Sequence, residues 1–185
     1  ITKIMLSYAL TFIMIELVNS STMVIDGIVV TVCGDVDTAA GKIEATSGGL
    51  DLLAADGVAK VSGQISAGAL ICTNAGTRVE FAAGTTLTVA DNGTLRLAGA
   101  DGQPLTLWSD EPSWTISPLA EVDMDVHHVA VSNSSATVAI GNMSGIDLGG
   151  NNANWKFLKP AREGCLVYWR GGGTDGGWGG ALNWE

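Results

Sequence analysis

The chain of 185 residues has a length typical of one domain with a single core. Its 9 lysine and arginine residues stand against 19 aspartate and glutamate residues, which gives a formal charge of −10. This acidic balance excludes a nucleic-acid partner, because a phosphate backbone requires a basic face. The 25 glycines, together with abundant threonine, valine, asparagine and aspartate, are typical of short strands and tight turns.

An apolar run covers residues 4–15, after Lys3 and before Glu16. It is shorter than the roughly 20 residues that a membrane-spanning helix needs, so we expect no membrane span in the folded domain. Two interpretations stay open. The run is either the apolar part of a signal peptide, with the small polar residues 19–21 near its cleavage site, or a strand buried in the core or capping its end. Residues 1–22 are therefore set apart as a signal-like or capping segment.

From Met23 onwards, polar and apolar residues alternate in short stretches, each followed by a turn. Residues 78–81 (RVEF) precede Gly84, and residues 94–97 (TLRL) precede Gly99. Apolar residues two positions apart face the same side of a strand, so each stretch predicts a short strand with one buried face. Turn glycines eight to eleven residues apart separate these strands, at positions 48, 57, 68, 76, 84, 93 and 102.

Two all-β architectures fit this spacing. An antiparallel sandwich or barrel normally has some longer strands, a long crossover and two-residue hairpin turns, for which residues 91–93 (DNG) are the best signal. A β-solenoid, here a single-stranded parallel β-helix, has uniformly short strands and buries each level against the next. The uniform strand and turn lengths favour the solenoid. About thirteen strands, taken three per coil, predict about four to five coils for residues 23–158.

The alternation also determines which side chains face the core. If the other set of alternate residues faced the core, Glu80 and Arg96 would be buried without partners, which is energetically costly. Both charged residues are therefore expected to face outward, together with Thr86 and Thr88. The residues predicted to face inward are Val79, Phe81, Leu87, Val89, Leu95, Leu97, Leu105 and Leu107.

Four segments of the second half of the chain follow one another in a recognisable order. They are residues 105–109 (LTLWS), 114–116 (WTI), 126–134 (VHHVAVSNS) and 146–157 (IDLGGNNANWKF). This order resembles the closing coils of bacterial right-handed parallel β-helix surface proteins, an autotransporter-like and adhesin-like group built from repeats. The tail at residues 168–184 resembles the Trp-Gly-Gly opening of a following module, so residues 159–185 are expected to form a linker or the start of that module.

The resemblance covers about residues 24–185 of the chain. It implies a right-handed parallel β-helix that is exported, has no enzymatic activity and forms a fragment of a larger surface protein.

The most distinct chemical candidate is a row of acidic residues that ends in a histidine. Glu121, Asp123, Asp125 and His127 occupy alternate positions, so they are expected on one face of a strand. Such a row is a candidate site for a hard cation such as Ca²⁺, or for an acid–base pair at a glycosidic bond. We favour a solvated outer face, because a single row lacks the carbonyl ligands that cation sites usually have. Of the adjacent histidines, His127 is expected to face outward and His128 to face the core.

The tryptophans are expected to play two roles. Because Leu105 and Leu107 are expected to face inward, Trp108 is expected to face outward. An exposed tryptophan is a candidate contact for a glycan. Trp114, Trp155 and Phe157 are instead expected to fill the core or to seal the end of a coil.

Neither the cysteines nor any known motif adds a catalytic or metal site. Cys33, Cys72 and Cys165 lack the spacing of a zinc site, and their odd number favours unpaired thiols, although one disulfide stays open. The sequence has no HExxH motif and no nucleophile elbow. We therefore predict no catalytic residue, no metal and no cofactor, and we lean against an enzyme.

The sequence thus predicts a structural or adhesive β-helix module of a secreted or cell-surface bacterial protein, at the outer membrane or outside the cell. Its expected partners are a surface polysaccharide or the surface of a host or neighbouring cell. The alternative function is a polysaccharide-binding module, or a polysaccharide lyase or glycoside hydrolase, on the same scaffold. A groove lined by Asp, Arg and Lys would favour a lyase, whereas a plain polar face would favour the scaffold.

Overall fold

The computed structural model describes residues 3–6, 10–12, 14–18, 20–110 and 113–160. Within these residues the chain forms strands, turns and loops but no helix. Cys165 and the tail motif at residues 168–184 lie outside the described residues, and the other two cysteines are unpaired. The strands are β1 (Lys3–Leu6), β2 (Leu10–Phe12), β3 (Ile15–Glu16), β4 (Thr22–Ile25), β5 (Val29–Val32), β6 (Val36–Leu52), β7 (Val58–Cys72), β8 (Arg78–Phe81), β9 (Thr86–Ala98), β10 (Leu105–Trp108), β11 (Trp114–Pro118), β12 (Asp123–His127), β13 (Val129–Val131), β14 (Ser134–Met143), β15 (Ile146–Asp147) and β16 (Ala153–Leu158).

The part of the chain that the structure describes contains no helix with the length and apolar character needed to cross a membrane.

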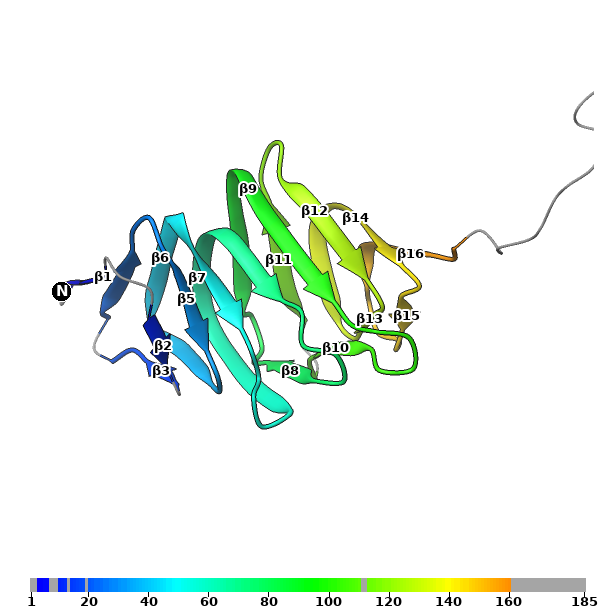
Figure 1. The fold of residues 1–185 in the computed structure, drawn as a ribbon, viewed down its shortest axis with the longest axis horizontal. Helices are drawn as coiled ribbons and strands as arrows, with labels where there is room; N and C mark the ends of the chain where they lie inside the picture. The colour runs from blue at the N-terminus through cyan, green and yellow to red at the C-terminus, as the bar shows by residue number, and fades with distance from the viewer. Residues whose placement is uncertain (1–2, 7–9, 13, 19, 111–112, 161–185) are drawn as a thin grey trace, which may run out of the picture.

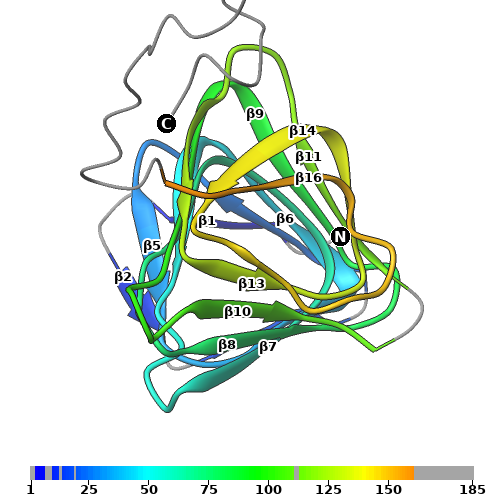
Figure 2. The ribbon, with the colours of Figure 1, turned by 90° about the vertical axis from the view of Figure 1, so that its right-hand side faces the viewer.

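The strands form three ladders, and every pairing between the named strands is parallel. The first ladder runs β1–β4–β6–β7–β9–β11–β14, the second runs β2–β5–β6–β7–β9–β12–β14–β16, and the third runs β3–β6–β7–β8–β10–β13–β15. The long strands β6 and β7 belong to all three ladders, and β9 and β14 to the first two. As a result, β9, β11, β14 and β12 close a small ring of pairings, with the other strands bonded outside it. Figure 2 shows the three-sided outline of this arrangement.

Each strand of a ladder forms one level of the stack. The levels of the first ladder follow the order of the chain, from blue to yellow in Figure 1. One column of in-register residues has seven levels, six of them within residues 23–158, for which the strand count predicted roughly four to five coils. The seventh level, at Ile4 in β1, precedes those residues. The column consists of Ile4, Met23, Ile43, Ile65, Leu87, Ile116 and Ala136.

The core lies between the three ladders, and the predicted alternation is confirmed. All eight residues predicted to face inward are buried, whereas Arg96 is exposed and Glu80 is partly exposed. The expectation for the core aromatics is confirmed for Trp114 and Trp155, whereas Phe157 is only partly buried and packs against the core. Trp114 is fully buried and stacks on Phe81 with ring centroids 4.0 Å apart. Trp155 is buried and donates a hydrogen bond from Nε1 to Ser134 Oγ at 2.9 Å.

The glycines at the corners are needed for two different reasons. Gly57 has a φ of 85°, a turn conformation that other residues rarely adopt. Gly68 instead allows neighbouring levels to approach, because a methyl group on it would lie 2.6 Å from the Thr46 carbonyl oxygen and 2.9 Å from that of Gly48. The turn signal in the sequence therefore marks both tight turns and close contacts between levels.

Asparagine side chains connect the last levels. The fully buried Asn142 donates from Nδ2 to the Val129 carbonyl at 2.8 Å and accepts from the Val129 N–H at 3.3 Å. Asn152 accepts from the Ser134 N–H at 3.0 Å and donates to the Val131 carbonyl at 2.9 Å. These bonds satisfy backbone groups at corners, where the regular ladder is interrupted.

The N-terminal apolar run contributes β1, β2 and β3, which pair with β4, β5 and β6, respectively. Within this run, the side chain of Ile15 is buried in the core. These strands extend the same three ladders.

Candidate functional site

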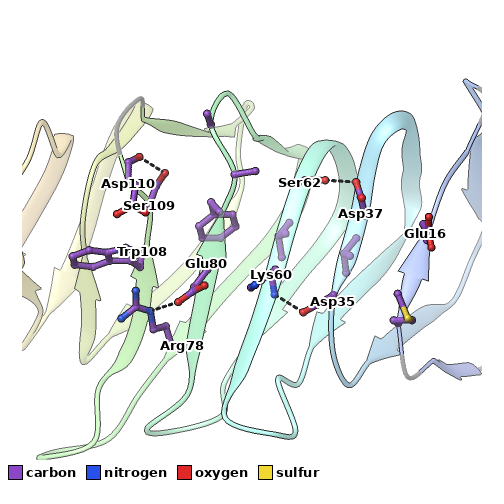
Figure 3. Close-up of a pocket in the computed structure, with 16 residues that line it drawn as sticks. Glu16, Asp35, Asp37, Lys60, Ser62, Arg78, Glu80, Trp108, Ser109 and Asp110 are labelled. Atoms are coloured by element: carbon purple, nitrogen blue, oxygen red, sulfur yellow. Dashed lines mark hydrogen bonds and ion pairs between the residues drawn. The ribbon is translucent and has the colours of Figure 1, made fainter.

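An open groove lies on the outward side of the third ladder (Figure 3). It has a volume of about 680 Å³ and crosses β3, β6, β7, β8 and β10. Neighbouring strands are about 4.8 Å apart, so outward side chains at matching positions form rows along the stack. We call this feature the ladder groove, and its central side chains are Asp35, Asp37, Lys60, Arg78, Glu80 and Trp108.

Trp108 faces outward into the ladder groove, as the alternation predicted, and it is partly exposed. The guanidinium carbon of Arg78, from β8, lies 4.6 Å from the centroid of its indole ring. This contact is a cation–π interaction, in which the negative ring face attracts the cation. It also restricts the side-chain freedom of both residues.

Glu80 neutralises the same arginine. Its Oε1 lies 2.9 Å from Arg78 Nε, and both side chains point outward from β8 because they are two residues apart. The two groups form an ion pair, but the geometry is not that of a hydrogen bond, and the buried Nε atom of Arg78 has no hydrogen-bond partner among the described residues. Both side chains are about one-third exposed, at 39% and 33%, so solvent reaches the pair. Such a pair orients Arg78 more than it stabilises the fold.

One row of outward residues runs through the groove with alternating charge. Lys60 is in register with Glu80, and Glu80 is in register with Trp108. On the other side of Lys60, its backbone N–H donates a hydrogen bond to Asp35 Oδ1 at 2.7 Å. A carboxylate, an ammonium group, a second carboxylate and an indole therefore follow one another on successive levels (Figure 3).

Asp37 lies in a second row, beside Ser62. The Ser62 hydroxyl and the Ala39 N–H both donate to Asp37 Oδ1. These bonds, that of Ser62 foremost, stabilise the carboxylate and lower its pKa below the ordinary value of 3.8. Asp37 is therefore ionised at neutral pH and is unsuited to act as a general acid there.

The groove as a whole carries more negative than positive charge. Two further carboxylates, Glu16 and Asp110, line it in addition to those of Asp35, Asp37 and Glu80, whereas Lys60 and Arg78 are its cations. Neither of the two histidines lines the groove. The arrangement offers hydrogen-bond donors, acceptors and one aromatic surface, which suits binding better than proton transfer.

The predicted acidic row is only partly formed. Asp123 and Asp125 are exposed on β12, and His127 Nε2 lies 3.9 Å from Asp125 Oδ1. Glu121 does not belong to this strand face, because it lies in the preceding turn with a φ of 54°. Among the described residues, no group of three or more His, Cys, Asp or Glu side chains is placed to hold a metal ion.

The expectation that His128 faces the core is wrong. Its φ of 52° ends β12 and breaks the alternation on which the expectation depended. The two histidine rings instead lie edge to face, with Nδ1 atoms 3.2 Å apart, and both are partly exposed.

The sequence predicted that Trp108 and Glu80 face outward, but not that they line one groove with Asp35, Lys60 and Arg78. A usable signal exists, because Asp35, Lys60 and Glu80 each directly precede a buried residue of one in-register column. That column contains Val36, Val61 and Phe81. Finding it requires the register between levels, which the alternation within a strand does not give.

The chain matches no protein-family model, no curated protein and no solved structure.

Proposed function

We propose that this chain is a structural and adhesive module of a secreted or cell-surface bacterial protein, built as a right-handed single-stranded parallel β-helix. The observation that carries the proposal is the run of parallel, in-register levels with a buried apolar interior. Such a stack buries apolar surface only between neighbouring levels, so it can extend a surface without a large globular core. The right hand follows from the strong preference of crossover connections between parallel strands.

A scaffold of this kind needs no reaction chemistry. Asp37 stays ionised at neutral pH and is therefore unsuited to act as a general acid there, and no histidine lines the groove. We expect the purified chain to release neither reducing ends nor unsaturated uronates from polygalacturonate, alginate or neutral glucans. Sustained release by the chain, lost on heat denaturation, would overturn the non-catalytic assignment.

The adhesive role has its own test. Beads coated with the chain are expected to be retained on bacterial or host cell surfaces more strongly than beads coated with the heat-denatured chain. Equal retention of the two kinds of bead would count against adhesion by the folded module.

A second candidate function, polysaccharide binding, is favoured by one specific observation. The ladder groove combines a partly exposed tryptophan with hydrogen-bond donors and acceptors, centred on Trp108, Arg78 and Lys60. A groove lined by Asp, Arg and Lys also supports the carbohydrate-active alternative over a plain polar face. The excess of carboxylates, however, has the wrong sign for the polyuronate substrate of a lyase. Binding without cleavage is therefore the form of this alternative that we retain.

A further inference from the structure

We infer that the ladder groove binds an uncharged glycan, with a sugar ring stacked at Trp108 and the chain lying across β3, β6, β7, β8 and β10. The inference deepens the polysaccharide-binding candidate above and rests on it. Four observations support it: the shape of the groove, its aromatic anchor, its mixture of hydrogen-bonding groups and its charge.

The shape suits an extended polymer. The groove is partly open to solvent and spans five neighbouring strands, which at about 4.8 Å per strand spacing corresponds to about 19 Å. A linear oligosaccharide can lie in such a groove and leave at both ends. A compact small-molecule site would instead enclose most of its ligand.

Trp108 and Arg78 form the anchor. Tryptophan and arginine are enriched among the residues that dominate binding energies at protein interfaces. The indole presents an apolar surface to the C–H groups of a sugar ring. Arg78, at 4.6 Å from the ring centroid, and Glu80, which pairs with Arg78, orient this anchor before any ligand arrives.

The polar groups around the anchor match hydroxyl chemistry. Lys60 and Arg78 are donors, Asp35 and Glu80 are acceptors, and the Ser62 hydroxyl is both. A sugar hydroxyl also donates and accepts, so it can bond to either kind of group along the row. The row thus requires no formal charge on the ligand.

The charge selects against a polyanion. The groove carries the carboxylates of Glu16, Asp35, Asp37, Glu80 and Asp110 against two cations, and the chain has a formal charge of −10. A uronate polymer would place like charges beside these carboxylates. A polycation would meet Arg78 at the anchor itself, over the Trp108 indole, and Lys60 two strands away. A neutral glycan avoids both conflicts.

The test is calorimetric titration of the full chain with four neutral hexasaccharides, namely cellohexaose, xylohexaose, maltohexaose and mannohexaose. Polygalacturonate and a chitosan oligomer serve as charged probes. We expect saturable binding of at least one neutral hexasaccharide, with an affinity that changes little between low and high salt, because no ion pair with the ligand is screened. The charged probes are expected to bind more weakly.

Trp108→Ala is expected to weaken that binding about tenfold or more, as loss of an aromatic anchor does. Trp108→Phe keeps an aromatic ring and should retain part of the affinity. Thr88→Ala, an outward residue of β9 away from the groove, is the matched control and should bind like the parent. Circular dichroism and thermal melts of each variant separate loss of the site from loss of the fold.

The inference is overturned if no neutral hexasaccharide saturates the chain, if folded Trp108→Ala binds like the parent, or if a charged probe binds more tightly than every neutral one. Beads that adhere to cells while the chain binds no neutral hexasaccharide would overturn this inference alone and leave the adhesive module standing. Glycan cleavage would instead overturn the non-catalytic assignment and leave the binding inference standing.

Discussion

Arg78 lies over the indole ring of Trp108, although the two residues come from different levels of the stack, in β8 and β10. Arg78 is in register with Thr106, two residues before Trp108, so both side chains point outward from adjacent strands. The contact therefore results from the parallel register. It places an ordered aromatic side chain on the outer surface, whereas Trp114 is enclosed in the core.

These two tryptophans are expected to differ sharply in their contribution to stability. Trp114→Ala removes a fully buried ring that stacks on Phe81 and bonds to the Ser132 carbonyl, so it should lower the free energy of unfolding by about 3–5 kcal/mol. Trp108→Ala removes a partly exposed ring and should cost at most about 1 kcal/mol. Chemical denaturation of both variants measures the difference. Equal losses would contradict the assignment of Trp108 to the surface.

Gly68 is expected to tolerate no side chain. Gly68→Ala places a methyl group against the carbonyl oxygens of Thr46 and Gly48, so the levels must separate, at a cost of about 1–3 kcal/mol. Gly141→Ala is the matched control, because its nearest neighbour would be Leu158 Cδ1 at 3.4 Å, a flexible side-chain end. Thermal melts compare the two variants. A Gly68→Ala variant as stable as the parent would show that the levels are not this close.

Asp37 is expected to contribute to stability in a pH-dependent way. Its pKa is lowered in the folded chain, mainly by the hydrogen bond from Ser62, so its contribution is fully present above the ordinary pKa of 3.8. The contribution is lost as the pH falls through the lower, folded pKa. Ser62→Ala should raise the pKa of Asp37 towards its ordinary value, whereas Ser66→Ala, in the first ladder, should not. A carbon-detected NMR titration of Asp37 measures both, and an unchanged pKa in Ser62→Ala would refute the assigned cause.

Cys72 is expected to be unreactive while the chain is folded. Burial, with a smaller effect from the charge of Asp51, raises the pKa of its thiol to about 12, so almost no thiolate exists near neutral pH. Iodoacetamide at about pH 8, followed by peptide mass spectrometry, should label Cys72 only after denaturation, because the thiolate is the reactive form. Labelling that is equally fast in the folded and unfolded chain would contradict this burial.

The alternation of residues such as Leu95 and Leu97 was sufficient to predict strands and the direction of their side chains. The expectation that all strands are short is wrong, because β6, β7, β9 and β14 have 17, 15, 13 and 10 residues. The alternation could not predict where strands end, because Glu121 and His128 adopt positive φ values without being glycine. Nor could it predict that Lys60, Arg78 and Trp108 lie in the same groove. Their proximity depends on the register between levels, and the connections between levels differ in length, as the column from Ile65 through Leu87 to Ile116 illustrates.

The most direct test of the proposed β-helix is a set of distances along one outward column. Val24, Glu44, Ser66, Thr88 and Ser117 follow one another in register on successive levels. Spin labels are placed in pairs at Glu44 and Ser117, and at Val24 and Ser117, after replacement of the native cysteines.

Pulsed electron paramagnetic resonance then measures both separations. Three and four spacings of about 4.8 Å predict backbone separations of about 14 and 19 Å, so the second pair must be longer by one level. Equal separations, or a shorter distance for the second pair, would contradict the parallel stack and with it the scaffold on which the ladder groove depends.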